Sequence, residues 1–395
     1  MNSEEDMKKY IAPTYGDSRF YGISPSSGEG CFLYDKDHKP YLDLLSGLGV
    51  TALGHNHPEI VQAIHDGAGL LHLSNLFIIT KQIEYAKFLA ANFPIKDANF
   101  FFCNSGAEAN AAAIKAASKN ERPYIAAMKG SFHGRYGDGN ATTCQTAYNS
   151  TRDTKNRWKT IYPHVIEIEF NNISQLEKIT DACFAVIYEP VQIEYGIFPA
   201  DKAYLEELRK RCDETGTIMI ADEVQTGFGR TGRLFASEHY PDAMPDIITM
   251  AKAIANGLPM AAVGFGEKGK KFIPGEHAST FGGNPFVCGV ATAVLDTIIS
   301  ESLLDKAADI EKVFYNYDFG SDLIIAKRGL GFIYGIEISK ELPAKKIIDK
   351  CLEKGVIIGP AENNTMRLEP PLIITPGQFT QGLDVLKETL GELAK

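Results

Sequence analysis

Two short apolar runs in the middle of the chain are each followed by a residue that can do chemistry. Residues 218–221 lead into Asp222, and residues 246–250 are followed, one position later, by Lys252. Such runs are typical of buried parallel strands, and polar groups that follow them gather in one cleft of an open α/β sheet. A lysine amine can bond to an aldehyde cofactor while a carboxylate keeps a pyridine nitrogen protonated. Taken alone, however, an Asp and a Lys are more often two solvated charges.

The composition is that of an ordinary folded protein. The 395 residues are 44% hydrophobic and 23% charged, which is enough for one large and one smaller domain. A formal net charge of −10 argues against nucleic acid or an anionic membrane as a partner. Seven scattered cysteines without a CxxC pair predict reduced packing residues rather than a disulfide framework or a zinc site. Without an apolar signal core or a long apolar run, we expect a cytoplasmic protein.

The sequence motifs that contain Asp222 and Lys252 indicate a function more specifically than the two residues do. ADEVQTGFGRTG at 221–232 and AKAIANGLPMAA at 251–262 closely resemble the signature of the class III aminotransferases, which are fold type I enzymes that use pyridoxal phosphate. The resemblance implies a cofactor pocket that includes Asp222, Glu223, Val224, Gln225 and Lys252.

Within that pocket the resemblance implies a separate role for each side chain. Lys252 forms the covalent link to the cofactor and moves a proton as general base. Asp222 pairs with the ring nitrogen, and Gln225 contacts the ring hydroxyl. Lys252 and Asp222 are therefore the expected catalytic residues.

An alanine-rich segment, NSGAEANAAAIKAAS, predicts a helix after a strand at residues 99–103. The first-turn amides of a helix are unpaired and the helix dipole is positive there, so a phosphate can bind where side chains are small. The residues alone leave this open, because Ser105 is also an ordinary helix cap. In the resembled family SGAEA holds the cofactor phosphate, which implies that role for Ser105, Gly106 and Ala107.

Other motifs of the resembled family imply substrate contacts at positions where the residues alone favour core or surface roles. In SFHGR, Phe132 is expected against the face of the cofactor ring, and Arg135 is expected to clamp a substrate carboxylate. In MRLEPPL, Arg367 is expected to bind the α-carboxylate, with Glu194 as its partner when that carboxylate is absent. Arg367 and Arg135 together are expected to hold the two carboxylates of glutamate.

The segment around Glu194 departs from the family pattern. Family members commonly have Gly-Glu-Gly-Gly where this chain has Ile193, Glu194, Tyr195 and Gly196. Because two glycines are replaced by larger residues, the identity of the substrate is less secure than the type of reaction.

The motif HASTFGGNP at 277–285 resembles a motif of the family, and this resemblance implies a homodimer with shared active sites. In the resembled family the threonine, here Thr280, reaches the cofactor phosphate of the neighbouring subunit, and the serine, here Ser279, approaches the substrate. A plain Ser/Thr turn is the alternative that spacing alone leaves open.

The resemblance runs over nearly the whole chain and implies its architecture. We expect an α/β fold of type I: a large domain with a mostly parallel seven-stranded sheet flanked by helices, and a smaller α/β domain. The pattern places an N-terminal arm and part of the small domain at 1–50, the large cofactor-binding domain at 51–287 and the C-terminal small domain at 288–395.

N-acetylornithine aminotransferases are the members of the class that the chain resembles most. This implies ping-pong transfer of an amino group from N2-acetylornithine to 2-oxoglutarate, with pyridoxal 5'-phosphate as the cofactor and no metal. Ornithine, succinylornithine, 4-aminobutyrate or putrescine as donor, a class III aminomutase, and a cofactor-binding regulator without catalysis are the alternatives.

Overall fold

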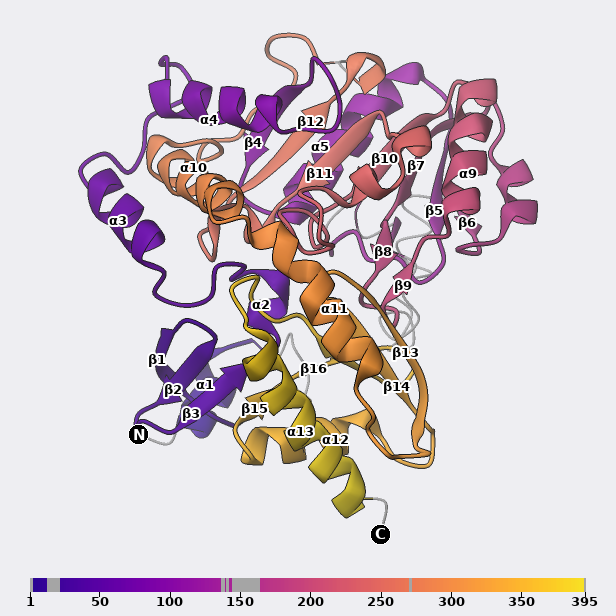
Figure 1. Cartoon of the computed structure of the whole chain (residues 1–395). Coiled ribbons are helices and arrows are strands. Elements are labelled where there is room, and N and C mark those ends of the chain that lie inside the picture. The colour runs from indigo at the N-terminus through magenta and orange to yellow at the C-terminus, as the bar shows by residue number, and fades with distance from the viewer. Residues whose placement is uncertain are drawn as a thin grey trace.

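A seven-stranded sheet forms the centre of the upper body in Figure 1. The computed structural model describes residues 3–12, 22–135, 139, 142, 143, 164–269 and 272–393. The strand order is β4-β12-β11-β10-β7-β5-β6, and every neighbouring pair is parallel except the two that involve β12. The expected mostly parallel seven-stranded sheet is thus confirmed. Its strands are β4 (Asn99–Cys103), β5 (Tyr124–Met128), β6 (Val165–Ile168), β7 (Cys183–Tyr188), β10 (Ile218–Asp222), β11 (Ile247–Met250) and β12 (Ala261–Phe265).

Helices cover both faces of this sheet, which is why its central strands are apolar along their whole length. Every residue of β7, β10, β11 and β12 is buried. The alanine-rich helix α5 packs into one hydrophobic cluster with the strands, and α9 and α10 pack into another. Helix α10 also contacts α3 and α4. These helices are α3 (Pro58–Gly67), α4 (Thr80–Ala91), α5 (Gly106–Ala117), α9 (Lys202–Thr215) and α10 (Pro285–Ser300).

The lower body in Figure 1 is built from both ends of the chain. Strand β3 pairs in parallel with β15, so the N-terminal segment joins the C-terminal part of the fold. Strands β2 (Phe32–Asp35) and β3 (Pro40–Asp43) pair as an antiparallel hairpin. One sheet has the order β1-β2-β3-β15, a second has the order β13-β14-β17-β16, and a short pair is β8-β9. The division at residue 288 stays a prediction, and it falls inside α10.

The remaining elements complete the description. The strands are β1 (Pro25–Glu29), β2 (Phe32–Asp35), β3 (Pro40–Asp43), β8 (Val191–Gln192), β9 (Phe198–Pro199), β13 (Ile324–Leu330), β14 (Ile333–Ile338), β15 (Val356–Ile357), β16 (Gly359–Ala361) and β17 (Thr365–Leu368). The helices are α1 (Ser3–Tyr10), α2 (Ser46–Gly49), α11 (Ala307–Asn316), α12 (Ala344–Glu353) and α13 (Pro376–Leu393). Short 3-10 helices are η1 (Ser118–Asn120), η2 (Ile173–Lys178), η3 (Ala236–His239), η4 (Pro241–Ala243), η5 (Lys252–Ala255), η6 (Glu267–Gly269) and η7 (Leu303–Lys306).

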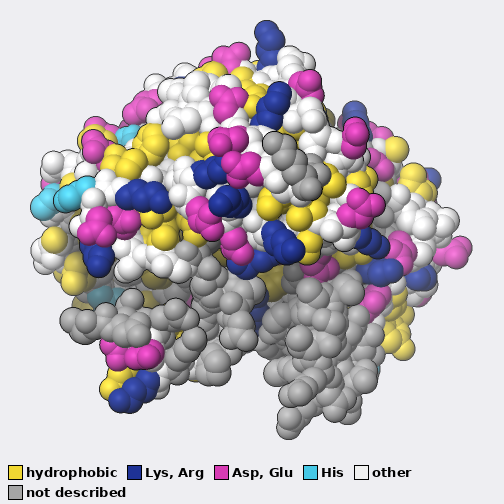
Figure 2. All heavy atoms as spheres, turned by 90° about the horizontal axis from the view of Figure 1, so that it is seen from below, with side chains coloured by type: hydrophobic (Ala, Val, Ile, Leu, Met, Phe, Trp, Pro, Cys, Tyr) yellow, Lys and Arg dark blue, Asp and Glu magenta, His cyan; other side chains and the backbone are white. Residues whose placement is uncertain are grey.

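The described surface is mixed in charge. On the face seen in Figure 2, acidic and basic side chains lie side by side, with apolar groups between them. Within the described ranges no single helix is long and apolar enough to cross a membrane; the bent pair Pro285–Ser300 and Leu303–Asn316 passes that test by length and composition alone.

Candidate active site

Asp222 is the last residue of β10, and its carboxylate is held from three directions. Oδ2 accepts a hydrogen bond from Nδ2 of Asn110 at 2.7 Å and lies 2.7 Å from Nδ1 of His133. Oδ1 accepts the backbone N–H of Val224 at 3.0 Å. Asn110 lies in α5 and His133 lies in the segment after β5. Two separate parts of the fold therefore fix the orientation of the Asp222 carboxylate.

Lys252 begins η5, two residues after β11 ends. Its ammonium donates a hydrogen bond to Oε1 of Gln225. Its backbone φ is 44°, in the left-handed region that residues other than glycine seldom occupy and that often marks functional sites. The residues that follow β10 and β11 therefore bring Lys252 and Gln225 into contact.

Burial dominates the electrostatics of Lys252. Loss of solvent lowers the pKa of its ammonium, and the negative charges of Glu369, Glu194 and Asp222 oppose that shift without cancelling it. A lowered amine pKa leaves more of the neutral nucleophile that can attack an aldehyde. Asp222 is among the charges that act on Lys252.

The start of α5 lies against the segment that carries Asp222. A Cβ added at Gly106 would lie 2.6 Å from Cγ1 of Val224, and one added at Gly134 would lie 2.9 Å from Cβ of Ala107. Ser105 is the N-cap, and its hydroxyl accepts the N–H of Glu108 at 3.3 Å. The small residues of SGAEA thus let the positive end of a helix reach the site, and the first-turn amides of such a helix have no partner within it.

Phe132 and Arg135 lie together in the segment after β5. The guanidinium carbon of Arg135 is 4.7 Å from the centre of the Phe132 ring, a cation–π contact, and Arg135 is exposed. The backbone N–H of Phe132 donates to Oε1 of Glu189 at 2.7 Å. Burial, with the charge of Asp222, raises the pKa of Glu189 well above its usual value. Glu189 is therefore a buried acid that holds its proton more tightly than an exposed glutamate does.

Arg367 in β17 pairs with Glu194, as the family resemblance implies. Nη1 of Arg367 lies 2.5 Å from Oε1 of Glu194, and only 3% of the Arg367 side chain is exposed. Burial tends to raise the pKa of Glu194, but the positive charges of Arg367 and Lys252 outweigh it and lower that pKa. The positive charge of Lys252 also acts on Glu194. This arrangement suits an ion pair that opens when a substrate carboxylate binds.

A second carboxylate, Glu369, approaches the same arginine. Its Oε2 lies 3.6 Å from Nε of Arg367, and its side chain is fully buried. Both oxygens accept from Nε2 of Gln225, at 2.8 and 3.0 Å. Because a carboxylate only accepts, it holds the amide of Gln225 with the oxygen toward Lys252.

Arg230 fixes the backbone next to Glu369. Its guanidinium donates to the carbonyl oxygens of Glu369 at 3.3 Å and Pro370 at 2.6 Å, and to the hydroxyl of Ser46 at 2.7 Å. Arg230 is fully buried, and burial lowers its pKa to about 10. One side chain from GFGRTG thus ties the N-terminal segment to the end of β17.

Glu223 has a structural task besides the cofactor contact that we expected. Its carboxylate accepts from the backbone N–H groups of Ala236 at 2.5 Å and Ser237 at 2.8 Å, and from the Ser237 hydroxyl at 2.6 Å. Burial raises the pKa of Glu223 to about 7, although these donors oppose the shift. Val224, in contrast, faces Gly106 at the start of α5.

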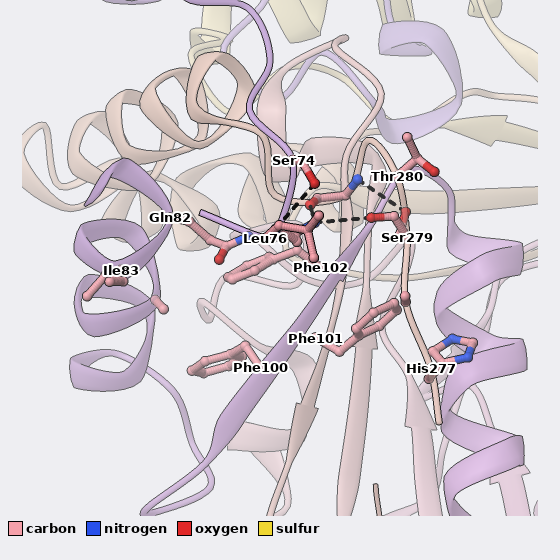
Figure 3. Close-up of a pocket in the computed structure, with 14 residues that line it drawn as sticks. Ser74, Leu76, Gln82, Ile83, Phe100, Phe101, Phe102, His277, Ser279 and Thr280 are labelled. Atoms are coloured by element: carbon pink, nitrogen blue, oxygen red, sulfur yellow. Dashed lines mark hydrogen bonds between the residues drawn. The ribbon is translucent and has the colours of Figure 1, made fainter. Parts of the chain in front are cut away.

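Ser279 and Thr280 lie at a separate cavity of about 620 Å³. Figure 3 shows both on one loop, near Ser74, with the phenyl rings of β4 along the wall. The hydroxyl of Ser279 accepts from Nδ2 of Asn104 and from the N–H of Gly282, both at 3.1 Å. The residues that line this cavity do not include Lys252.

Four side chains of the site went unrecognised in the sequence: Asn110, His133, Glu189 and Glu369. Asn110 was detectable as the one amide in an alanine-rich helix, and His133 as the neighbour of Phe132 in SFHGR. Glu189 and Glu369 each precede a proline, which gave no hint of a buried acid.

Comparison with known proteins decides the family. The family model described as "Aminotransferase class-III" matches residues 15–390. The chain belongs to the class III aminotransferases. It is an enzyme of this pyridoxal phosphate-dependent family. A partly buried lysine in contact with Gln225, a buried carboxylate held at the end of β10 and the start of α5 fit that cofactor. Among the described residues no group of three or more His, Cys, Asp or Glu side chains could hold a metal ion.

Relatives of this aminotransferase match over nearly its full length. An acetylornithine aminotransferase from Caldanaerobacter subterraneus subsp. tengcongensis is 38% identical, with 98% of each chain covered. One from Methanocaldococcus jannaschii is also 38% identical, with 98% of each covered. Among solved structures, the ornithine aminotransferase from Toxoplasma gondii ME49 has a TM-score of 0.89 at 26% identity, covering 100% of this chain and 95% of that one. The acetylornithine aminotransferase from Elizabethkingia anophelis has a TM-score of 0.82 at 30% identity, covering 99% and 98%.

Proposed function

We propose that this aminotransferase moves the terminal amino group of N2-acetylornithine to 2-oxoglutarate. The products are N-acetylglutamate semialdehyde and glutamate, in a step of arginine biosynthesis. The proposal rests on one cluster of side chains. In it Lys252 donates a hydrogen bond to Gln225, and the charges of Asp222 and Glu194 act on the pKa of Lys252. The names of the relatives that match along the whole chain support the choice of donor.

The protein side chains divide the work. When bound, pyridoxal phosphate supplies an aldehyde that takes up the amino group and a ring that accepts electrons. Lys252 provides the covalent link and then moves the proton at the carbon that bears the donor amine. Asp222, which Asn110 and His133 orient, would pair with the ring nitrogen. The first turn of α5 would bind the phosphate.

The substrate contacts follow from the charges at the other end of the site. Arg135 binds the carboxylate of acetylornithine and one carboxylate of glutamate, and Arg367 binds the α-carboxylate of glutamate. Glu194 occupies Arg367 while no α-carboxylate is present, and it moves aside when glutamate or 2-oxoglutarate enters. Two half-reactions with different donors can thus use one pocket.

A homodimer with shared active sites is part of the proposal. Thr280 lies in a cavity whose lining does not include Lys252, so its contact with a cofactor phosphate calls for a second subunit. Large apolar side chains on the segment before α4 and on the Thr280 loop are exposed, namely Leu76 at 92%, Phe77 at 65%, Ile78 at 84% and Phe281 at 61%. An apolar surface of this kind is typical of an obligate interface.

A donor panel tests the proposal. Purified holoenzyme is assayed with 2-oxoglutarate and, in turn, N2-acetylornithine, N2-succinylornithine, ornithine, 4-aminobutyrate and 1,4-diaminobutane. The highest kcat/KM is expected for N2-acetylornithine, with glutamate formed in equal amount. Turnover of an amino acid without any 2-oxo acid would instead indicate an aminomutase. Cofactor binding without a spectral change on adding any donor would indicate a regulator.

A further inference from the structure

The loop that carries Glu194 is held by three successive backbone carbonyl groups. This Glu194 loop, residues 193–197, joins the short strands β8 and β9. The donors to its carbonyls are the backbone N–H of Glu362 to Glu194 at 2.9 Å, Nδ2 of Asn363 to Tyr195 at 2.5 Å, and Nε and Nη2 of Arg328 to Gly196 at 3.1 and 3.0 Å. All three donors lie in or beside the sheet β13-β14-β17-β16, which also carries Arg367. The loop is therefore attached to the strands around that arginine.

The backbone of the Glu194 loop is strained at Ile197. Its φ is 57°, in the left-handed region, where a β-branched residue is an outlier. The Ile197 side chain is fully buried against β14, where a Cβ added at Gly335 would lie 3.0 Å from Cβ and Cδ1 of Ile197. Gly335 is the partner of Arg367 in the pairing of β14 with β17. A strained backbone of this kind persists only where its surroundings hold it, so the loop should relax if those contacts are lost.

Arg328 is the one charged donor of the three, and it is itself fixed in place. Its guanidinium carbon lies 4.1 Å from the centre of the Phe198 ring, whose centre is 5.9 Å from that of the Tyr195 ring. Nη1 of Arg328 donates to Oε2 of Glu337 at 2.6 Å. Two further nitrogens reach the carbonyl of Gly196. A planar guanidinium makes these contacts together, which the single ammonium of a lysine cannot do.

Charge alone does not direct Glu194 to Arg367. Burial tends to raise the pKa of Glu194, but the positive charges of Arg367, Lys252 and Arg135 outweigh burial and lower that pKa. All three cations attract the carboxylate, and it pairs with Arg367. The position of the loop backbone therefore helps to select this partner.

We propose that Arg328 is a positioning residue that keeps Glu194 on Arg367. It acts through the carbonyl of Gly196, which it holds in the strained loop. The inference rests on the proposed function, in which Glu194 leaves Arg367 whenever an α-carboxylate binds.

Loss of the Arg328 contact has opposite effects on two kinds of ligand. If the loop relaxes, Glu194 pairs less firmly with Arg367, so a dicarboxylate displaces it at a smaller cost and binds more tightly. A donor that brings no carboxylate to Arg367 then leaves a buried guanidinium less well paired, which is unfavourable, and it should react more slowly. A general loss of stability would instead weaken both.

The test compares wild-type holoenzyme with Arg328→Met and Asn363→Gly. Arg328→Met removes the guanidinium, and Asn363→Gly removes the amide while allowing the φ of 56° at that position. Glutarate, a dicarboxylate that cannot react, is titrated calorimetrically into each protein. Both variants should bind it about fivefold more tightly, equivalent to ~1 kcal/mol. With 2-oxoglutarate as acceptor, kcat/KM for N2-acetylornithine should fall by about the same factor.

Lys327→Met is the matched control, because Lys327 is a cation on the same strand that also holds backbone carbonyls. Its ammonium donates to the carbonyls of Phe314 at 3.1 Å and Tyr315 at 2.8 Å and lies 5.6 Å from the centre of the Phe314 ring. Glutarate affinity should be unchanged in this variant. Arg328→Lys, which keeps the charge but not the planar group, should fall between the wild type and Arg328→Met.

Unchanged or weaker glutarate binding in both Arg328→Met and Asn363→Gly overturns the inference. Equal tightening in Lys327→Met overturns it as well. If Arg328→Met does not fold, Asn363→Gly alone decides. The glutarate titration needs no amino donor, so a wild type that fails to convert N2-acetylornithine overturns the proposed function, while the titration still supports or overturns the role of Arg328.

Discussion

The carboxylate of Asp222 lies 2.7 Å from Nδ1 of His133, a histidine with no exposed side-chain surface. The other ring nitrogen, Nε2, is buried and has no hydrogen-bond partner within the described residues. The ring therefore contributes one polar contact, and that contact is to the acid we assign to the cofactor ring.

His133→Leu is expected to lower kcat by about 10- to 100-fold. Leucine fills much of the space but cannot orient Asp222, and a hydrogen bond to a charged group is worth ~1.5–3 kcal/mol. Steady-state kinetics and a urea titration measure activity and stability on the same preparation.

His239→Leu is the control, because His239 is partly buried and its hydrogen bonds within the described residues are to Thr231. It should change stability with little effect on kcat. An equal fall of kcat in both variants would show that His133 has only a packing role.

Lys252→Ala is expected to abolish turnover and the visible absorption of the bound cofactor, because no other side chain would form the covalent link. Absorption spectra of the reconstituted protein check this. Persistence of the band together with turnover would remove Lys252 from its proposed role.

Lys252→Met is expected to make the cofactor-free protein more stable at neutral pH. Burial lowers the pKa of Lys252, so the folded state binds its proton less tightly than the unfolded state does. The stability of the wild type should rise as pH increases through the lowered pKa up to the usual value near 10.4. Denaturant titrations across that range should show the advantage of the Met variant shrinking as pH rises, and a constant difference would contradict the assignment.

Arg367→Ala is expected to reduce kcat/KM for glutamate about 100-fold, equivalent to ~2.7 kcal/mol, because the variant loses the α-carboxylate contact and leaves Glu194 unpaired. For 1,4-diaminobutane the loss should be below about tenfold, or ~1.4 kcal/mol. Kinetics with the two donors measure the difference, and equal losses would reject a carboxylate-binding role.

Tyr195→Gly is expected to change the ratio of kcat/KM between donors about fivefold, or ~1 kcal/mol. The Tyr195 ring packs over Gly130, where an added Cβ would lie 2.5 Å from Cγ of the tyrosine, and so it braces the loop that carries Glu194. The same donor panel checks this. An unchanged ratio would make Tyr195 a loop residue without influence on the pocket.

The strands were predictable because they are buried on both faces and so read as unbroken apolar runs. Asp222 and Lys252 stood out because each is charged and follows such a run, and the family motifs supplied their roles. The partners of these residues were not predictable. Asn110 lies 112 positions from Asp222, and Glu369 lies 144 positions from Gln225. Such contacts depend on how helices and strand ends meet in space, which local pattern does not encode.

The role of Thr280 depends on a surface that one chain leaves open. Its loop is polar and rich in glycine, so sequence alone predicts a turn there as readily as a contact with a second subunit. The cavity that Thr280 lines has room for a group from another chain, and its lining alone does not identify that group.

Arg230 is one of the links between the N-terminal segment and the C-terminal part of the chain. Removing the strand end at residues 369–370 or the hydroxyl at Ser46 would strand a positive charge in the interior. We therefore expect truncation near either terminus to disturb the site around Lys252, because Arg230 contacts both segments. Truncation from one side should abolish catalysis before the other side unfolds.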